Sequence, residues 1–403
     1  MEEIVATVYA GAHERRWCPV WADVSREEAS RLGGSCVAVD EYGLEYPVQL
    51  EPVGERLRAW WILPALSRGQ AKRFTLKPLE PAAARDQAAA QKRGVHFTDR
   101  EEEAVDVEIG GALFTSYQYA AAWARPFLYP VVGPGGAWVT RSYPMRDDIK
   151  TERRDHPHHK SIYFTHGDVN GVDNWSEQPG HGRTRHQRFT KMEPGPVFGD
   201  LASHNLWVDK DDRPILEQAI SLRFYALPGH VRLFDAAVTF HATYGDVVFG
   251  DTKEGGLLSV RVTSTMDASG AGRIETATGA QGESESWGRP AAWCHYSGPV
   301  QTPAGPVIAG IGVLDHPTNP RHPTHWHVRD YGLMTANPFG LSYYYKDKSR
   351  DGSLRLPAGE RITFRYRVVV HEGDAAEGRI REHYAAFAYP PAVKVEQPQR
   401  AAN

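Results

Sequence analysis

The stretch LRFYALPGHVRLFDAAVTF, residues 222–240, carries the clearest fold signal in this chain. Two runs rich in strand-forming residues, Leu222 to Leu227 and Val231 to Phe240, flank the pair Pro228-Gly229. Proline and glycine favour turns, because proline fixes φ and glycine tolerates positive φ. The stretch therefore predicts a β-hairpin with two antiparallel strands.

Similar strand signals recur outward from this hairpin at short spacing. Further strands are expected within Val105 to Ile109, Ser161 to Phe164, Gly256 to Thr265, Val307 to Leu314 and Arg361 to Val368. Helical periodicity is confined to Glu377 to Ala388, near the C-terminus. Many strands and few helices predict an all-β fold, a large antiparallel β-sandwich.

Composition divides the chain into four regions. Residues 1–80 contain EYPVQLEPV, LRAWWILPAL and AKRFTLKPL and predict a small β-rich N-terminal unit. The segment PAAARDQAAAQKRG, residues 81–94, predicts a linker or a short helix. Residues 95–390 would form the sandwich, and residues 391–403 would form a tail.

Charge and motif content exclude several classes of protein. The net charge of -4 over 403 residues argues against a nucleic-acid-binding surface, which is usually strongly basic. No apolar run reaches the roughly 18 residues of a membrane span, and the N-terminus lacks the apolar core of a signal peptide. We therefore expect a cytoplasmic protein with no membrane partner. Cys18, Cys36 and Cys294 form neither a zinc pattern nor a disulfide framework.

The first candidate site segment is RRDHPHHKSIYFTHGDVNGVDNW, residues 153–175. It concentrates four histidines and three aspartates: His156, His158, His159, His166, Asp155, Asp168 and Asp173. Pro157 disfavours helix, so an extended run would place His156 and His158 on one face and His159 on the other. Because imidazole titrates near neutrality, the cluster indicates proton transfer or metal binding.

A second histidine-rich segment is LDHPTNPRHPTHWHVRDYGLMTANPFG, residues 314–340. His325 and His327 would share a face of an extended segment, and Trp326 would offer a flat surface for a sugar ring. Arg321, Arg329, Asp330 and Asn337 add charge and amide groups. We expect this segment to form the wall of a cleft opposite the first segment.

A third candidate is Glu254, in the run GDTKEGG at residues 250–256. A carboxylate at the entrance of a strand can serve as a general base when its surroundings tune its pKa.

These segments, together with GPGGAWVTRSYPM, resemble the bacterial PmoA-like family over about residues 95 to 390. The family often carries the automatic label "methane oxygenase" and is similar to the galactose-mutarotase-like supersandwich. The resemblance implies that fold and an activity on carbohydrates. The positions that match the family's pattern are His158, His159, His166, Asp168, Asn170, Glu254, His325 and His327.

The first functional hypothesis is an enzyme that acts on a sugar or glycoside by acid–base chemistry. The expected catalytic residues are His158, His159, His166, Glu254, His325 and His327. The expected substrate-binding residues are Asp155, Asp168, Asn170, Asp173, Trp175, Arg321, Trp326, Arg329, Asp330 and Asn337. Elimination or hydrolysis of an oxidised (keto) glycoside and mutarotation all fit these groups. In one variant, two or three histidines hold Mn, Zn, Fe or Ni.

Two alternatives remain open at the level of sequence. A non-catalytic carbohydrate-binding protein would use the same aromatic and polar groups without turnover. A metal-dependent oxygenase is the other alternative. The sequence leaves homo-oligomerisation open. Each hypothesis in which both histidine-rich segments form a single site requires that the two segments lie close together in the folded chain.

Overall fold

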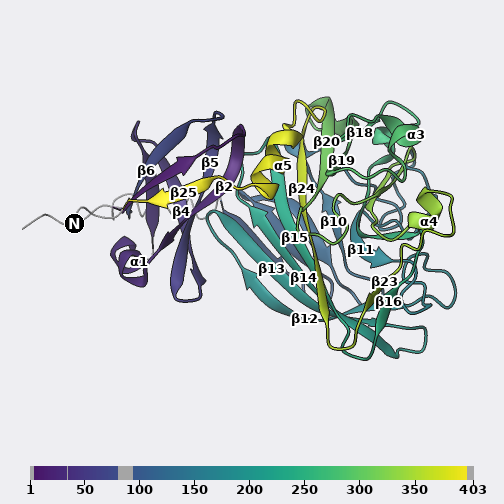
Figure 1. Cartoon of the computed structure of the whole chain (residues 1–403). Helices are drawn as coiled ribbons and strands as arrows, with labels where there is room; N and C mark the ends of the chain where they lie inside the picture. The colour runs from purple at the N-terminus through teal and green to yellow at the C-terminus, as the bar shows by residue number, and fades with distance from the viewer. Residues whose placement is uncertain (1–3, 34, 80–93, 397–403) are drawn as a thin grey trace, which may run out of the picture.

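The computed structural model describes residues 4–33, 35–79 and 94–396 of the chain (Figure 1). Its strands form two eight-stranded sheets that pack against each other, a seven-stranded sheet beside them and a short two-stranded sheet. Within the described residues, the paired strands of the two large sheets are antiparallel, as in β14 with β15 and β10 with β11. The structure therefore confirms the expected all-β fold, a large antiparallel β-sandwich with a small β-rich N-terminal unit.

The first sheet has the strand order β21-β22-β17-β11-β10-β9-β8-β7. Its strands are β7 (Val95–Asp99), β8 (Ala104–Ile109), β9 (Ala112–Gln118), β10 (Phe127–Val131), β11 (Ile162–His166), β17 (Gly255–Arg261), β21 (Trp326–Arg329) and β22 (Leu333–Ala336). The connections after β10 and β11 carry the first histidine-rich segment and the loop that follows it, and the second segment includes the chain that leads into β21, together with β21 and β22.

The second sheet has the strand order β12-β13-β14-β15-β24-β20-β19-β18. Its strands are β12 (Arg183–Glu193), β13 (Phe198–Val208), β14 (Pro214–Tyr225), β15 (Val231–His241), β18 (Arg273–Thr276), β19 (Trp293–Thr302), β20 (Gly305–Asp315) and β24 (Arg361–Glu372). β16 (Val247–Phe249) and β23 (Leu354–Leu356) form the two-stranded sheet. The predicted hairpin is confirmed, because β14 pairs with β15 and Phe224 lies opposite Phe234.

The sandwich core lies between the two large sheets. On β11, Ile162 and Phe164 point into this core, whereas Tyr163 points to the opposite side and joins a separate aromatic cluster with Trp175. We call the side of the first sheet that carries Tyr163 its outer face. Because successive side chains of a strand point to opposite sides, one side of the first sheet packs into the apolar core, and its outer face can carry polar and aromatic groups.

The N-terminal sheet combines both ends of the chain (Figure 1). Its strands are β1 (Ile4–Tyr9), β2 (Arg15–Val24), β3 (Cys36–Asp40), β4 (Glu45–Val53), β5 (Arg56–Leu66), β6 (Ala71–Pro78) and β25 (Ala392–Val395). β25 pairs with β1. Without β25, that edge of β1 would be unpaired. The expected tail from residue 391 is therefore wrong for Ala392–Val395. The expected linker, residues 81–94, lies outside the described residues except for Gly94.

Helices are short and peripheral: α1 (Arg26–Leu32), α3 (Gly282–Ser286), α4 (Leu341–Tyr344) and α5 (Ile380–Ala388). α5 lies between the N-terminal sheet and the second sheet (Figure 1). Arg15 of β2 is buried and donates to the carbonyl oxygens of Ala385 (3.1 Å) and Tyr389 (2.7 Å) at the end of α5. The Tyr389 carbonyl thereby gains a donor just beyond the helix end, and the Ala385 carbonyl, which also accepts from the Tyr389 N–H at 3.0 Å, gains a second one.

The N-terminal sheet packs on the side of the second sheet that faces away from the core. Trp60 contacts Phe198 with ring centroids 5.7 Å apart. Gln49 accepts hydrogen bonds from the backbone N–H groups of Val197 and Phe198, both at 3.1 Å. Apolar packing and satisfied backbone groups therefore join the two units.

No described helix is long and apolar enough to cross a membrane. The three cysteines are buried and unpaired, so no disulfide contributes to the described fold.

Candidate active site

A row of polar side chains crosses the outer face of the first sheet. The strand register places His327 beside Thr335, Thr335 beside Ser259, and Ser259 beside Tyr163. All four residues are at most 1% exposed. The Thr335 hydroxyl donates to the Ser259 hydroxyl at 3.0 Å. Burying polar groups costs free energy unless they are hydrogen-bonded, so a row of buried polar side chains on one face indicates a functional site.

The segment around Pro157 covers this face as a turn. His156 has a φ of 41°, and its carbonyl oxygen accepts a hydrogen bond from the His159 N–H at 3.0 Å. The turn gathers three imidazoles: His156 stacks on His159 at 4.8 Å, and His158 packs edge-on against His159 at 4.3 Å. The expected extended run, with His159 on the other face, is wrong because the backbone of His156 is left-handed.

Two buried arginines hold the turn in place. Asp155 accepts from Arg141 at 2.7 Å and from Arg261 at 2.8 Å. Burial alone would raise the pKa of Asp155, but Arg261 and Arg141 lower it below its usual value. Arg141 also donates to the carbonyl oxygen of His156 at 2.8 Å. The carboxylate and the turn are therefore fixed relative to each other.

The same arrangement fixes a tautomer of His159. An Arg261 guanidinium nitrogen lies 3.2 Å from Nδ1 of His159. Guanidinium can only donate, so Nδ1 accepts and the proton of the neutral ring resides on Nε2. Burial lowers the pKa of His159 well below its usual value, and neighbouring His158 and Arg261 lower it further. His159 is therefore a neutral, oriented imidazole.

Aromatic rings extend the cluster on two sides. Tyr331 stacks on His156 with ring centroids 5.0 Å apart, and the Arg261 guanidinium lies 4.8 Å from the centre of the Tyr331 ring. Trp175 is 1% exposed and packs against His159 at 5.3 Å. Trp175 therefore forms the wall behind the imidazoles, whereas the half-buried Tyr331 can meet a ligand.

His327 belongs to the same electrostatic group. The pKa of His327 is lowered to about 3, mainly by burial and then by Lys253, Arg329 and His156. The pKa of His158 is likewise lowered to about 3, mainly by burial and then by Arg125. The rings of His158 and His327, one from each histidine-rich segment, are therefore neutral at pH 7.

Glu254 lies at the edge of this group. Its carboxylate is 46% exposed and pairs with Lys253. Burial raises the pKa of Tyr331, and Glu254 and Asp155 raise it further, against the lowering effect of Arg329 and Arg261. Gly256 has a φ of 157°, and a Cβ atom there would collide with Thr335. The glycine pair therefore lets the chain carry Glu254 directly to the start of β17.

His166 and His325 are placed apart from the imidazole cluster. His166 contacts Phe339 at 4.8 Å and Phe249 at 6.0 Å, both in the sandwich core, and its Nε2 lies 2.8 Å from the Gly250 carbonyl oxygen. The sheet thus separates His166 from His159. His325 stacks on Tyr344 at 5.6 Å.

Trp326 differs from the expected sugar-stacking role. It is 0% exposed, lies in the sandwich core, and donates from Nε1 to the Ala291 carbonyl oxygen at 2.9 Å. Alternation along β21 explains this, because Trp326 and His327 must point to opposite sides.

Three expected ligand-binding residues hold their own loop. Asp168 accepts from the Gly171 N–H at 2.9 Å. Asn170 accepts from the Val248 N–H at 2.7 Å, and Asp173 accepts from the Trp175 N–H at 2.7 Å. In this structure Asp168 and Asp173 shape the loop after β11, and Asn170 joins that loop to β16.

The polar residues of the second segment are also engaged in structure. Arg321 donates to the Pro338 carbonyl oxygen at 3.0 Å, and Asn337 donates to the Thr252 carbonyl oxygen at 2.9 Å. Arg329 pairs with Glu283 at 2.8 Å. Asp330 accepts from the Glu283 N–H at 3.1 Å. Only Arg329 also contacts the imidazole cluster, since its guanidinium lies 5.4 Å from the centre of the Tyr331 ring.

Arg141, Arg261 and Lys253 were not among the residues expected from sequence. A signal exists for Arg261, which ends the otherwise apolar and small run GGLLSV of β17. Arg141 follows a strand-like run and has no comparable signal. The roles of Arg141 and Arg261 depend on Asp155, which lies far from Arg261 in the chain.

Metal binding finds no support in the geometry of the described residues, where no three His, Cys, Asp or Glu side chains are grouped to hold an ion. A large pocket of about 650 Å³ lies away from the imidazole cluster. Arg16, Trp17 and His371 help to line it, between the N-terminal sheet and the second sheet. We place the candidate active site at the imidazole cluster, because its groups can carry out acid–base chemistry.

Comparisons with known proteins give a family and no activity. The model described as "Family of unknown function (DUF6807)" matches residues 104–385. This match does not support the PmoA-like label. A search of curated proteins found no match.

Two solved structures are distant neighbours. A protein in the glycosyl hydrolase family 38 from Enterococcus faecalis aligns at 9% identity and a TM-score of 0.38 over 98% of this chain. This chain spans 47% of that protein's length. A GalM/aldose epimerase homologue from C. elegans aligns at 8% identity and a TM-score of 0.26, over 70% of this chain and 99% of its own. Neither similarity is close enough to support an inference about activity.

Proposed function

We propose a function for this chain, which belongs to the DUF6807 family of unknown function: acid–base catalysis on a sugar or glycoside at the outer face of the first sheet. The observation that supports the proposal is the stack of Tyr331, His156 and His159, with centroid distances of 5.0 and 4.8 Å. Glu254 is one of the groups that raise the pKa of Tyr331. An aromatic ring, an imidazole and a carboxylate in one place suit a sugar ring and its exchangeable protons.

Each group has a role that its surroundings favour. Glu254 is accessible and would act as the general base, taking a proton from a carbon or hydroxyl of the substrate. His156 is the most exposed imidazole of the cluster, and its Nδ1 lies 3.4 Å from the Asp155 carboxylate. Because it is accessible and its ring is oriented by this contact, His156 would act as the general acid toward a leaving or ring oxygen.

The buried imidazoles would position the substrate rather than exchange protons. His159 and His327 are neutral because burial lowers their pKa values. Neutral imidazole can donate one hydrogen bond to a substrate oxygen without carrying charge. Elimination or hydrolysis of an oxidised (keto) glycoside is the reaction we favour; it needs both a base and an acid, and mutarotation, the alternative, needs the same two groups.

Two variants test the proposal. Glu254→Gln and His156→Asn should each lower turnover of a keto-glycoside on the order of 100-fold or more while sugar affinity, measured by calorimetry, changes little. Glu108→Gln is the matched control, since Glu108 alternates with the core residues Val107 and Ile109 on β8 and so lies on the outer face of the same sheet.

The same assay separates the alternatives. Optical rotation followed with aldoses would detect mutarotation. If the wild-type protein binds sugars but turns over no keto-glycoside, glycoside or aldose, the protein is a carbohydrate-binding protein and the enzymatic proposal fails.

A further inference from the structure

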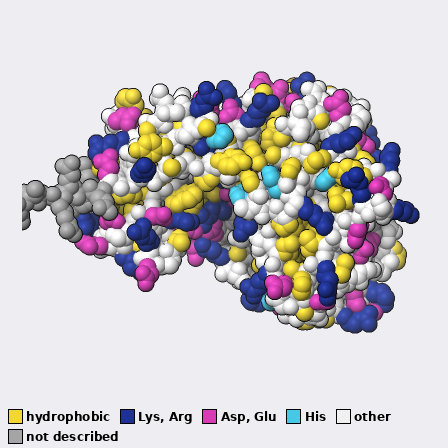
Figure 2. Space-filling view, viewed as in Figure 1, with side chains coloured by type: hydrophobic (Ala, Val, Ile, Leu, Met, Phe, Trp, Pro, Cys, Tyr) yellow, Lys and Arg dark blue, Asp and Glu magenta, His cyan; other side chains and the backbone are white. Residues whose placement is uncertain are grey.

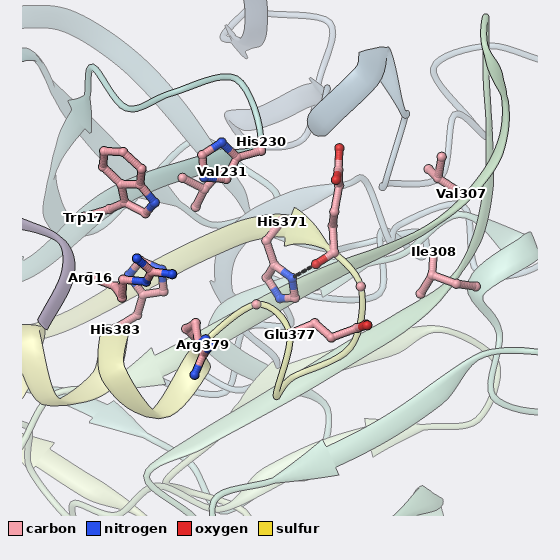
Figure 3. A pocket seen from close by; sticks show the side chains of 13 residues that line it. Arg16, Trp17, His230, Val231, Val307, Ile308, His371, Glu377, Arg379 and His383 are labelled. Atoms are coloured by element: carbon pink, nitrogen blue, oxygen red, sulfur yellow. Dashed lines mark hydrogen bonds between the residues drawn. The ribbon is translucent and has the colours of Figure 1, made fainter. Parts of the chain in front are cut away.

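A second cluster of histidine and arginine side chains lines the pocket of about 650 Å³ between the N-terminal sheet and the second sheet (Figure 3). Its walls come from β2, β15, β20, β24 and the start of α5. The sandwich core separates this pocket from the imidazole cluster, which lies on the outer face of the first sheet. Figure 2 shows histidine side chains and apolar side chains at the surface near this junction.

We propose that this pocket binds a monosaccharide that carries one anionic group, a carboxylate or a phosphate. Arg16 and Trp17 would bind the anionic group and the sugar ring, and His383 would complete the site. Binding here needs no reaction at the outer face, so it stands independently of the proposed function.

The cationic end of the pocket contains an unused guanidinium. Arg16 is exposed and, within the part of the chain that the structure describes, its side chain has no hydrogen-bond or ion-pair partner. Arg379 also lines the pocket and makes only a long contact of 3.5 Å with Glu382. Guanidinium groups present paired donors that match the oxygens of carboxylate and phosphate.

An aromatic ring lies next to this end of the pocket. Trp17 and His230 pack edge to face with centroids 5.4 Å apart, and both are drawn beside Arg16 in Figure 3. The backbone of Trp17 has a φ of 44°, which is unfavourable for a bulky residue. Strained backbone of this kind persists where it serves a function, and here it accompanies an indole that lines the pocket.

A buried imidazole without a partner provides the second, independent indication of a ligand. His383 is 2% exposed, lines the pocket, and has no hydrogen-bond partner for Nδ1. Burial lowers its pKa to about 3, so the ring is neutral. The start of α5 also has no side-chain cap, and Arg379 at that position has a φ of 54°. The positive end of the helix thus adds to the field that favours an anion.

A rigid pair of histidines supports the wall. Nε2 of His371 lies 2.9 Å from Nε2 of His295, and Nδ1 of His371 lies 2.8 Å from the Glu372 carbonyl oxygen. The carbonyl can only accept, so Nδ1 of His371 carries the proton and His295 donates to Nε2. This hydrogen-bond chain holds the His371 ring in one orientation.

The opposite end of the pocket is acidic. Glu377 lines the end near Ile308 in Figure 3, and Glu372 lines it as well. Carboxylates accept hydrogen bonds from hydroxyl groups, so a ligand with an anion at one end and hydroxyls at the other matches both ends. Such a polarity is typical of sugar acids and sugar phosphates and is absent from a neutral monosaccharide.

Titration calorimetry with the full-length protein tests the inference, using glucose 6-phosphate, glucuronate and neutral glucose as probes. At least one anionic probe should bind at least tenfold more tightly than glucose, and Arg16→Gln should weaken that binding at least tenfold. Arg188→Gln is the control, since Arg188 is an exposed arginine on β12 of the second sheet. Binding of only one anionic probe would identify phosphate or carboxylate as the group.

Trp17→Phe and Glu254→Gln separate this pocket from the proposed active site. Trp17→Phe should remove any change of tryptophan fluorescence that the anionic probe causes, whereas Glu254→Gln should leave the anion affinity unchanged. Failure of both anions to bind the wild-type protein, or binding that Arg16→Gln leaves intact, would overturn the inference. Loss of turnover in Glu254→Gln with anion binding retained would leave it standing.

Discussion

Tyr331 stacks on His156 with ring centroids 5.0 Å apart and ring planes 8° from parallel. The two residues come from different histidine-rich segments of the chain. Their contact joins the turn after Asp155 to the connection between β21 and β22. The Arg261 guanidinium lies over the Tyr331 ring of the same stack. The two segments therefore meet through ring packing.

Removing the Tyr331 ring should loosen the turn that carries His156. Tyr331→Ala is expected to destabilise the protein by about 1–3 kcal/mol, because it removes an aromatic stack and a cation–π contact. Hydrogen exchange at residues 156–160 should accelerate. Tyr331→Phe keeps the ring and should behave like the wild type in the same exchange measurement. Equal exchange in all three proteins would contradict the idea that the stack holds the turn.

The Asp155 carboxylate forms ion pairs with two buried guanidinium groups. Arg141 and Arg261 have side chains that are 0% exposed, whereas the Asp155 side chain is 33% exposed. Asp155→Asn should cost about 2–3 kcal/mol, below the usual loss for a buried pair because solvent screens this carboxylate in part. Urea unfolding would measure the loss. Asp148→Asn, at an exposed pair with Arg146, is the control and should leave the midpoint unchanged.

The buried histidines should make stability depend on pH in the acid range. The pKa values of His158, His327 and His383 are lowered to about 3, mainly by burial. Between pH 6.5 and about 3 the unfolded chain binds protons that the folded chain does not. The free energy of unfolding should therefore fall with decreasing pH, by up to about 1.4 kcal/mol per pH unit for each such histidine.

Urea unfolding at several pH values between 7 and 5 would measure this slope. His383→Gln should reduce the slope, whatever its effect on stability at pH 7, since it removes one of the titrating groups. A free energy of unfolding that is independent of pH over this range would show that these imidazoles are not buried as the structure has them.

The C-terminal strand should stabilise the N-terminal sheet. β25 pairs with β1 from Ala6 opposite Val395 to Tyr9 opposite Ala392. Deleting residues 391–403 would expose the edge of β1, and open edges favour association between chains. We expect a lower Tm by calorimetry and larger species in size-exclusion chromatography. Deleting residues 397–403 alone keeps β25 and should preserve the wild-type behaviour; the same loss in both deletions would contradict a role for β25.

Several elements could be predicted from sequence because their signals are local. The hairpin around Pro228-Gly229 and the strands in Val307 to Leu314 and Arg361 to Val368 follow from residue type and alternation alone. The final helix was expected near Glu377 to Ala388 and is α5 (Ile380–Ala388). β25 was missed, since a strand of four residues gains its stability from β1 and not from its own sequence.

The candidate site was only partly predictable, for the same physical reason. His158, His159 and His327 could be named from sequence, yet the left-handed backbone of His156 that gathers the first two depends on Arg141 holding its carbonyl oxygen. Arg261 and Tyr331 reach the cluster only through strand pairing and loop packing.

Sequence alone determined that this chain is a β-sandwich with two histidine-rich segments, because alternation and turn residues act over a few neighbouring positions. Tertiary structure decided which side of the first sheet each residue occupies. It placed Trp326 in the core and its neighbour His327 on the outer face, and it turned His166 inward against Phe339. Those outcomes depend on strand register, and a shift of one residue would exchange the two faces.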